Sequence, residues 1–426
     1  MKNYFINFTI VLIALFIAAT IGEIFLRIFW ESVPPRVDSR TMGGMSLPGW
    51  PDFLRFVPDT KTIAVSPTAE FAVHYKINSF GMRDREHSKR RNVNTCRILF
   101  VGDSFTEGYG VEQHEAYPSH IEYLSQGVLE SLNAGMRGIC PSFAFFRLQR
   151  FIDFGLEFDA VVYQVFDNDF YDDAVYTDLV QLRSDPVECI VRGPFYKADR
   201  VFRFLGPFAW PLSHLKLSWL FATAFLNTPA GSAETRVYPV SITQKIMDIY
   251  KSDGVEGVRV QRIADGKNEI VFPTLSKKML CTNKVNELWR LLRDINFEVN
   301  PKNTKEVPLL TSPAEYPDDV KRSLHYLDCL ATLCSNRNIP LYIVYQPGMP
   351  LISRQNEYYF KSWCIEKGIP FLSMREDLRT ISMKSEKAIF FPIDGHLAPE
   401  GHRLVAKMIF KWLKSLLPLY STTSKQ

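Results

Sequence analysis

Hydrophobic residues follow two patterns along the chain, one long unbroken run near the start and several short runs further on. Residues 4–21 (YFINFTIVLIALFIAATI) contain no charged residue and are almost entirely apolar. After residue 96, short apolar runs alternate with segments in which apolar residues recur every three or four positions. The long run is typical of a membrane-spanning helix, and the later pattern predicts strands that alternate with helices.

The long run is sufficient for one membrane crossing. As a helix, residues 4–21 cover about 27 Å, close to the roughly 30 Å hydrocarbon core of a bilayer. A cleaved signal peptide is the alternative, but the run is longer than the apolar region of such peptides, and Ala18-Ala19-Thr20 makes a poor cleavage site. We therefore expect residues 1–30 to form a transmembrane anchor. The flanking basic residues do not set its orientation, because they lie on both sides of the run.

The short runs predict an α/β fold. Expected strands lie within residues 97–103, 132–135, 159–167, 340–347 and 370–374, and expected helices span 117–129, 318–336 and 399–417. Such alternation places helices on both faces of a parallel sheet. We expect a three-layer αβα architecture with a mostly parallel, five-stranded, flavodoxin-like sheet.

The same patterns divide the chain into parts. Residues 31–96 are expected to form a connector and N-terminal extension, residues 97–417 the α/β domain, and residues 418–426 a C-terminal tail. The alternation breaks between about 176 and 311, which predicts a large insertion. Within it, residues 202–225 are rich in aromatic side chains. We interpret this segment as the core of the insertion, with a cap over the active site or a surface resting on the bilayer as alternatives.

Composition excludes several classes of function. The 426-residue chain is 46% hydrophobic and 23% charged, as expected for a packed globular protein, and its net charge of +4 is too small to indicate nucleic-acid binding. The seven cysteines contain no C-x-x-C pair, although Cys189 and Cys281 bracket part of the insertion and could pair in an oxidising compartment. Asp169, Asp172 and Asp173 lack histidines at metal-ligand spacing, so we expect neither a metal nor a cofactor.

A serine follows the first predicted strand. Ser104 lies in the segment 102–108 (GDSFTEG), at the carboxyl end of a buried strand, where reactive groups gather in parallel α/β sheets. The segment is not the G-x-S-x-G turn of α/β-hydrolases, because residue 106 is Thr. It is not a phosphate-binding loop, since no G-K-[ST] follows. Ser104 is therefore either a candidate nucleophile or a helix-capping residue.

Two more segments end at the same edge of the predicted sheet. Gly135 closes the second strand and Asn168 follows the third. With the backbone N–H of Ser104, the Gly135 N–H and the Asn168 amide would supply three donors to a tetrahedral oxyanion. Turn geometry for Gly135 and a turn-capping side chain for Asn168 are the alternatives.

An acid–base pair is expected near the C-terminus. Asp394 and His396 are two residues apart in a predicted extended loop, so their side chains point to the same side. Asp394 would accept a hydrogen bond from one ring nitrogen of His396, leaving the other nitrogen to take the Ser104 proton. His402 is the rival base, but its position inside a predicted helix favours packing or capping.

Together these segments resemble the four sequence blocks of the SGNH (GDSL-like) hydrolase family. The matching segments are GDSFTEG at 102–108, NAG at 133–135, ND at 168–169 and DGHLAPEGH at 394–402. The resemblance covers about residues 97 to 417 and implies Ser104 as nucleophile, Gly135 and Asn168 as oxyanion donors, and Asp394 with His396 as the acid–base pair. Residues 23–27 and 77–84 also resemble single-span bacterial members; we interpret 77–84 as structural.

The last block departs from the commonest family pattern. Two residues usually separate the aspartate and the histidine, whereas only Gly395 separates them here. Similar shortened spacing occurs in family branches that act on cell-surface polysaccharides. The shortened spacing is therefore compatible with activity. Together with the aromatic segment 202–225, however, it also supports an alternative to an enzyme, an inactive scaffold or glycan-binding subunit of an envelope assembly.

The resemblance implies a membrane-anchored serine esterase that hydrolyses O-acyl esters, foremost O-acetyl esters, of carbohydrate or lipid. An O-acetyltransferase that modifies an envelope polysaccharide with the same residues is the nearest alternative. The resemblance also implies a single-pass protein of the cytoplasmic membrane, with its catalytic domain on the periplasmic side and with polysaccharide-modifying proteins as partners. Acyl length, natural substrate and oligomeric state do not follow from the sequence.

Overall fold

The computed structural model describes residues 2–29, 56, 58–59, 61–182, 189–191, 235–262, 267–272, 281–297, 312–348 and 354–417. Most of the predicted connector, the aromatic segment 202–225 and the tail 418–426 lie outside the described residues. The predictions for those segments therefore stay predictions.

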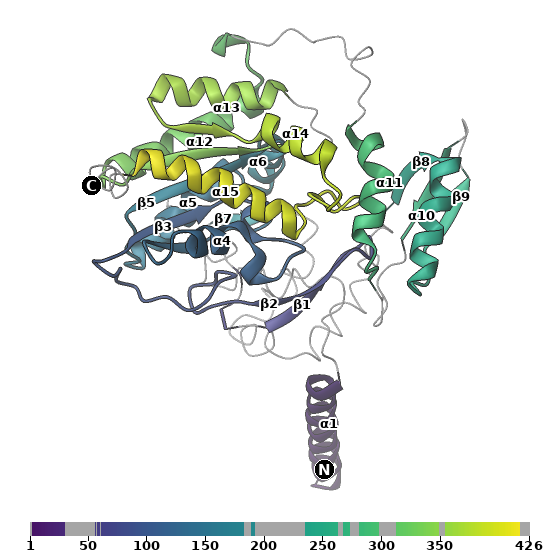
Figure 1. Cartoon of the computed structure of the whole chain (residues 1–426). Coiled ribbons are helices and arrows are strands. Elements are labelled where there is room, and N and C mark those ends of the chain that lie inside the picture. The colour runs from purple at the N-terminus through teal and green to yellow at the C-terminus, as the bar shows by residue number, and fades with distance from the viewer. Residues whose placement is uncertain are drawn as a thin grey trace.

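A five-stranded sheet forms the centre of the protein (Figure 1). Its strands are β3 (Cys96–Val101), β4 (Leu129–Asn133), β5 (Ala160–Phe166), β11 (Leu341–Gln346) and β12 (Phe371–Ser373). They are arranged in the order β12-β11-β5-β3-β4, and every neighbouring pair is parallel. Numbered along the chain this is the order 2-1-3-4-5 of flavodoxin-like folds, which confirms the predicted fold class.

Helices cover both faces of the sheet, which explains why its central strands β3, β5 and β11 are buried along almost their whole length. All six residues of β11 are buried. On one face α4 (Tyr117–Leu124) packs against α15 (Pro399–Leu416), and on the other α12 (Asp318–Ser335) packs against α5 (Pro141–Asp153) and α6 (Asp169–Leu179). The helices α13 (Arg354–Lys367) and α14 (Arg375–Lys384) flank β12 in the chain. Three layers result, as predicted.

The helix α4 is shorter than its sequence pattern predicts. We expected a helix over residues 117–129, but α4 ends at Leu124. Gln126 and Gly127 have φ angles of 54° and 86°, in the left-handed region that does not continue a right-handed helix. The chain turns there, and β4 begins at Leu129, three residues before the expected strand.

The N-terminal extension contributes a hairpin beside the sheet. β1 (Lys61–Val65) and β2 (Ala72–Lys76) pair in antiparallel fashion through a turn at residues 66–71. The short helices α3 (Ser104–Glu107) and η1 (Gln113–Glu115) follow β3. This hairpin places residues 66–71 next to the C-terminal part of the chain, as the hydrogen bonds described below show.

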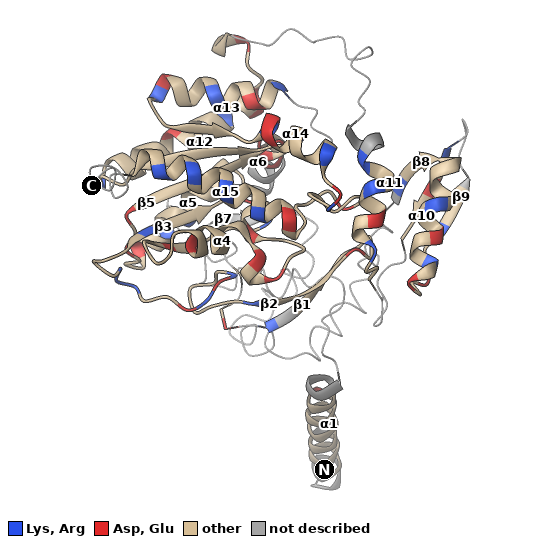
Figure 2. Ribbon diagram, viewed as in Figure 1, with Lys and Arg blue, Asp and Glu red and all other residues tan. Residues whose placement is uncertain are grey.

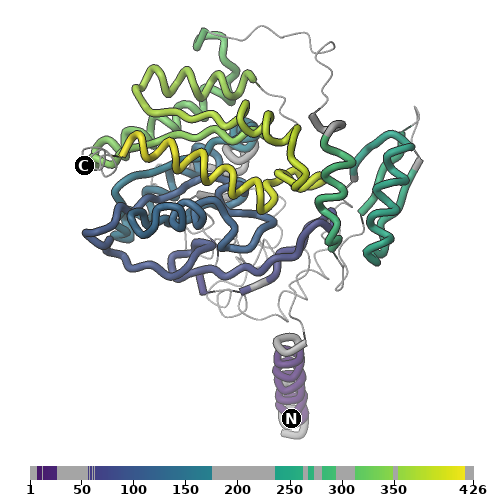
Figure 3. The backbone as a smooth tube through the Cα atoms, in the orientation of Figure 1, coloured from purple at the N-terminus to yellow at the C-terminus, as the bar shows by residue number. Residues whose placement is uncertain are grey.

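The insertion between β5 and β11 contains its own small core. The insertion begins with the two short strands β6 (Val180–Leu182) and β7 (Cys189–Val191). Further on, β8 (Thr235–Pro239), β10 (Lys267–Val271) and β9 (Arg259–Arg262) form an antiparallel sheet in that order. The helix α10 (Val240–Ser252) lies between β8 and β9 in the chain, α11 (Val285–Phe297) follows β10, and η3 (Pro313–Glu315) precedes α12. We call the described part of residues 235–297 the insertion unit. Its core includes Tyr250 and Phe272 and also takes in Ala69 and Ile393 from outside the unit. Figure 3 shows the backbone of the insertion unit, coloured teal to green, at one side of the central sheet.

One N-terminal apolar helix, α1 (Lys2–Phe29), is long enough to cross a membrane. Its most hydrophobic window spans Asn7–Phe25, with a mean hydropathy of 2.4. The charged residues of the other described helices are of both signs and interspersed (Figure 2). The six cysteines whose side chains are described are free, and the Cys281 thiol donates to the Phe71 carbonyl oxygen over 3.0 Å. The suggested pairing of Cys281 with Cys189 is therefore not present.

Candidate active site

Ser104 is the first residue of a four-residue helix that starts directly after β3. The carboxylate of Asp103 caps this helix by accepting the Phe105 N–H over 2.9 Å. The Ser104 carbonyl oxygen accepts the N–H groups of Gly108 and Tyr109 over 3.1 and 2.9 Å. These contacts hold Ser104 at the carboxyl edge of the sheet, with 9% of its surface exposed.

The acid–base loop, residues 389–398, runs between α14 and α15. It is closed by the Phe391 N–H, which donates to the His396 carbonyl oxygen over 2.7 Å, and by the Gly395 N–H, which donates to the Phe391 carbonyl oxygen over 2.8 Å. Gly395 has a φ of 92°, a left-handed conformation that glycine adopts readily. This turn brings the side chains of Asp394 and His396 together.

Three sequence-predicted residues form one hydrogen-bonded chain. The Nε2 atom of His396 lies 2.8 Å from the Ser104 hydroxyl oxygen, although the two residues are 292 positions apart. The Nδ1 atom of His396 lies 2.5 Å from Oδ1 of Asp394. A neutral imidazole protonated at Nδ1 satisfies both contacts, because Nδ1–H then donates to Asp394 and Nε2 accepts from Ser104.

The charges around His396 favour the protonated form of its imidazole. Burial acts to lower the pKa of His396, but the charge and hydrogen bond of Asp394, together with the charge of Asp103, outweigh burial and raise the pKa above its ordinary value. The Arg137 guanidinium opposes this shift. The imidazole is thus supported in the cationic form that it would take on after accepting a proton.

Aromatic rings surround the imidazole. The ring centroids of Phe105 and Tyr109 lie 5.2 and 4.8 Å from that of His396. The guanidinium carbon of Arg137 lies 4.4 Å from the centre of the Tyr109 ring. These rings restrict the rotation of the imidazole and keep Nε2 directed at Ser104.

The two expected oxyanion donors lie in different surroundings. The Gly135 N–H donates to the side-chain oxygen of Asn133 over 3.0 Å, and a Cβ on Gly135 would come within 2.2 Å of the Glu107 nitrogen. Gly135 therefore packs directly against the helix that carries Ser104. Asn168 is exposed, and its amide nitrogen donates to Asp172 over 2.8 Å. Within the described residues, the Ser104 N–H has no hydrogen-bond acceptor.

His402 and the aspartates near Asn168 do not join this chain. His402 is completely buried, its Nδ1 accepts the Tyr117 N–H over 3.3 Å, and burial lowers its pKa to about 3. Asp173 accepts hydrogen bonds from the hydroxyl groups of Ser142 and Ser323, each over 2.5 Å. Across the part of the chain that the structure describes, no group of three His, Cys, Asp or Glu residues is arranged to hold a metal ion.

Sequence reasoning missed two buried ionisable residues that support the site. Arg83, in the segment interpreted as structural, donates to the carbonyl oxygens of Gly108 and Val111 over 2.6 and 2.5 Å, so it holds the end of the Ser104 helix. Glu70 accepts backbone N–H groups of the acid–base loop. The I-N-S-x-G-M-R-D resemblance at 77–84 was a signal for Arg83, whereas nothing in the local pattern marked Glu70.

A third buried ionisable residue, Glu107, lies at the end of the Ser104 helix. Glu107 is paired with Arg137 over 2.5 Å and accepts the Tyr75 hydroxyl over 2.6 Å. Burial acts to raise the pKa of Glu107, but the charge of Arg137 and these hydrogen bonds hold it below its ordinary value. This ion pair joins the strand β2 and the loop after Gly135 to the Ser104 helix.

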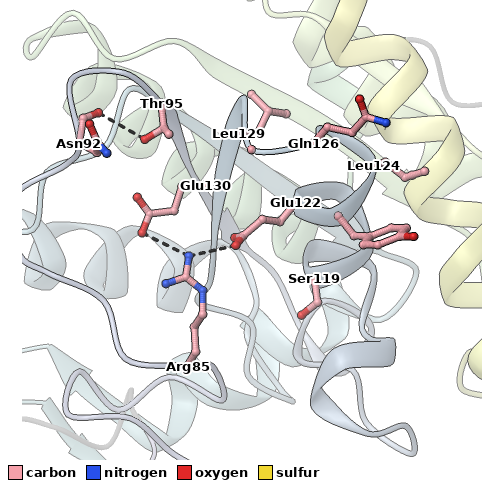
Figure 4. Close-up of a pocket in the computed structure, with 11 residues that line it drawn as sticks. Arg85, Asn92, Thr95, Ser119, Glu122, Leu124, Gln126, Leu129 and Glu130 are labelled. Atoms are coloured by element: carbon pink, nitrogen blue, oxygen red, sulfur yellow. Dashed lines mark hydrogen bonds and ion pairs between the residues drawn. The ribbon is translucent and has the colours of Figure 1, made fainter.

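A pocket of about 830 Å³ lies at the opposite edge of the sheet (Figure 4). It is lined by the N-terminal end of β4 and by α4, and Arg85 points between Glu122 and Glu130, at 3.0 and 3.5 Å. None of the three hydrogen-bonded residues lines it. The pocket is therefore separate from the candidate active site.

The fold and the site define a five-stranded α/β protein with a hydrogen-bonded Ser-His-Asp chain at the carboxyl edge of its sheet. No protein-family model and no curated protein matches the chain. Its neighbours among solved structures are GDSL/SGNH-like lipolytic proteins and esterases, at low identity and over most of the chain.

Three of these neighbours illustrate the similarity. The acetyl xylan esterase AlAXEase is 11% identical, with 74% of this chain and 98% of that one covered and a TM-score of 0.34. A GDSL-like lipase from Bacteroides thetaiotaomicron is 8% identical, with 78% and 93% covered and a TM-score of 0.33. A carbohydrate acetylesterase family member from Sinorhizobium meliloti is 11% identical, with 76% and 99% covered and a TM-score of 0.29. Similarity at this level does not assign a function, which must come from the residues of this chain.

Proposed function

We propose that this protein is a membrane-anchored serine esterase of the SGNH type that hydrolyses O-acyl esters, foremost O-acetyl esters, of carbohydrate or lipid. The observation that carries the proposal is the continuous hydrogen-bonded chain from Ser104 through His396 to Asp394. In such a chain a histidine removes the serine proton while an aspartate holds its tautomer. The substrate class follows from the resemblance of the sequence blocks to the SGNH family.

Acylation begins with proton transfer from the Ser104 hydroxyl to Nε2 of His396. The serine oxygen forms a bond to the ester carbonyl carbon, and the carbonyl π electrons move onto the oxygen. When the tetrahedral intermediate collapses, the bond to the leaving alkoxide breaks and the alkoxide takes the proton from Nε2. The products are a free alcohol and acyl-Ser104.

Backbone and side-chain donors stabilise the oxyanion in this proposal. Among the residues that the structure describes, no acceptor takes the Ser104 N–H, and Asn168 has a second amide hydrogen beyond the one given to Asp172. The Gly135 N–H would exchange the Asn133 oxygen for the oxyanion when substrate binds. Each such donor contributes about 3 kcal/mol to the transition state in enzymes of this kind.

Deacylation repeats the proton transfer with water. His396 takes one proton from a water molecule, whose oxygen attacks the acyl carbon, and Ser104 leaves with the proton that His396 held. The carboxylic acid is released and the resting site is restored. If a sugar hydroxyl replaced water in this step, the protein would be an acyltransferase, so product analysis with and without a glycan acceptor separates the two activities.

In this proposal α1 anchors the enzyme in the cytoplasmic membrane, with the catalytic domain on the periplasmic side. Apolar side chains along Asn7–Phe25, among them Phe8, Leu15 and Phe16, are exposed in the folded chain, which favours a nonpolar environment around them. Alkaline extraction of membranes tests the anchor: the full-length protein should stay in the pellet, with its N-terminal sequence intact. A mature chain that starts after residue 25 would instead identify a cleaved signal sequence.

Labelling with a serine-directed fluorophosphonate tests the catalytic proposal. The wild-type protein should be labelled at Ser104, the Ser104→Ala variant should not, and an aryl acetate should compete with the label. A folded wild-type protein that resists labelling and hydrolyses no acetyl ester would favour the inactive scaffold instead.

A further inference from the structure

The side chain of Glu70 holds two consecutive amides of the acid–base loop. Its Oε1 accepts the Ile393 N–H over 3.0 Å, and its Oε2 accepts the Asp394 N–H over 2.7 Å. The Thr68 hydroxyl donates to the same Oε2 over 2.6 Å. Glu70 is 3% exposed, so bulk water cannot take its place as the acceptor for these N–H and O–H groups. A residue more than 300 positions away in the sequence therefore orients the backbone of Asp394.

The turn that carries Glu70 is built around a left-handed residue. Ala69, immediately before Glu70, has a φ of 57°, which is uncommon for a residue with a Cβ. The Ala69 N–H donates to the Ser66 carbonyl oxygen over 3.1 Å, and the Ala69 carbonyl oxygen accepts the Thr282 N–H over 2.9 Å. Such a conformation persists only where the surrounding contacts over-determine it. The turn and the insertion unit thus fix the direction in which the Glu70 side chain points.

The insertion unit contacts both partners of the Glu70 interaction. The Tyr250 hydroxyl donates to the Thr68 carbonyl oxygen over 2.7 Å, on the Glu70 side. The Arg236 guanidinium donates to the Ile393 carbonyl oxygen over 3.3 Å, on the loop side. Ala69 and Ile393 are both buried in the core of the unit. The unit therefore packs around the two hydrogen bonds from the Ile393 and Asp394 amides to Glu70, which we call the Glu70 clamp.

We propose that Glu70 is a positioning residue for the acid–base pair, and that the insertion unit acts through Glu70 as a fixed part of the active site. The inference rests on the proposed function and assigns a role to a region that the sequence blocks do not cover. By holding the backbone at 393 and 394, Glu70 places the Asp394 carboxylate against Nδ1 of His396. A displacement of about 1 Å in such a group costs a catalysed reaction up to about a hundredfold in rate.

The electrostatic setting of Glu70 supports a positional role. Burial and the charge of Asp394 raise the pKa of Glu70 to about 8, against the opposing hydrogen bonds of Thr68, Ile393 and Asp394. A second buried carboxyl beside Asp394 does not favour folding by its charge. What it contributes at this place is the pair of hydrogen bonds to the Ile393 and Asp394 amides.

The Glu70→Gln variant tests the clamp, because an amide cannot accept from both N–H groups. In either orientation of the Gln side chain, its NH₂ group faces one of the two backbone donors. We expect kcat on an aryl acetate to fall about tenfold to a hundredfold, with KM unchanged, because the loop is displaced while substrate contacts remain. Glu122→Gln is the matched control: Glu122 accepts the Ser131 N–H over 2.8 Å at the opposite edge of the sheet, and its loss should leave kcat unchanged.

Tyr250→Phe tests the contribution of the insertion unit with little change in packing. The variant loses only the hydroxyl that donates to the Thr68 carbonyl oxygen. We expect kcat to fall about threefold to tenfold, again with KM unchanged. The exposed Tyr171 provides the matched control, since Tyr171→Phe removes a hydroxyl from the surface and should alter neither constant.

Hydrogen exchange of the segment 389–398 gives a readout that does not depend on activity. In Glu70→Gln the amides of Ile393 and Asp394 should exchange faster than in wild type, while the segment around Ser104 exchanges at the wild-type rate. Wild-type exchange in the variant, or a wild-type kcat, would overturn the positioning role. If wild type itself failed to react with a fluorophosphonate, the esterase proposal would fall, and the exchange measurement would still decide whether Glu70 holds the loop.

Discussion

The turn that carries Ser104 and the loop that carries His396 differ in where their supporting contacts come from. The Ser104 turn is held by neighbours in the sequence, such as the Asp103 cap and the N–H group of Gly108, and by two arginines, Arg83 and Arg137, whose partners in the turn lie 25 and 30 positions away. The acid–base loop also closes on itself, but its backbone is held by Glu70, more than 300 positions away. One half of the site is therefore largely local and the other depends on long-range contacts.

This difference has a consequence for stability within the site. Local turns form from few residues, whereas a loop held from a distance needs the hairpin β1–β2, the insertion unit and α15 to be in place together. Loss of any one of these contacts should displace Asp394 and His396 before it displaces Ser104. Substitutions in one half or the other should therefore have separable effects.

The largest effect should come from removing either end of the hydrogen-bonded chain. Ser104→Ala and His396→Ala should each lower kcat on an aryl acetate by about 10⁴-fold or more, because the residues act as one unit. For the same reason the double variant should be no worse than either single variant. Steady-state kinetics with circular dichroism as a control for folding provides the measurement. Independent, additive losses would contradict a shared mechanism.

The Asp394→Asn variant should show the next largest loss in kcat, and the pH dependence of its activity should change. Asn at 394 favours the wrong imidazole tautomer, and a loss of about 10³-fold to 10⁴-fold in kcat is expected. In wild type the pKa of His396 is raised, so activity should fall as the pH falls through a midpoint above 6.5, where His396 becomes protonated. The variant lacks the carboxylate that raises this pKa, so the midpoint of its residual activity should move to lower pH. A midpoint that stays in place would show that another group titrates.

The local half of the site was largely predictable and the long-range half was not. Short apolar runs predicted all five strands of the sheet, and the order of Ser104, Asp394 and His396 along the chain pointed to the residues that the structure brings together. Glu70 followed no pattern, because its partners are determined by the tertiary fold. The end of α4 was missed because Gln126 adopts a left-handed conformation that its residue type does not suggest.

Gly135 gives a stability test of the local half. A Cβ at this position would lie 2.2 Å from the Glu107 nitrogen and 2.5 Å from the Thr106 carbonyl carbon, both backbone atoms of the Ser104 helix. Gly135→Ala should therefore destabilise the protein by about 3 kcal/mol or more, as overpacking against a backbone does. Urea unfolding measures this loss. A variant of wild-type stability would show that the Ser104 helix can move away from Gly135 at little cost.

Of these variants, Gly395→Ala should have the smallest effect, and its loss of stability should contrast most clearly with that of Gly135→Ala. A Cβ on Gly395 would meet no atom within 4 Å, so Gly395→Ala adds only the strain of a φ of 92° in a residue with a side chain. We expect a loss of about 1 kcal/mol in the free energy of unfolding. Because Gly395 joins Asp394 to His396, kcat should also fall, by less than about tenfold. Gly127→Ala is the matched control, since Gly127 has a φ of 86° and open space around its Cα but lies far from the site. The two variants should lose equal stability, and only Gly395→Ala should lose activity; equal kcat values would mean that the loop tolerates strain without moving His396.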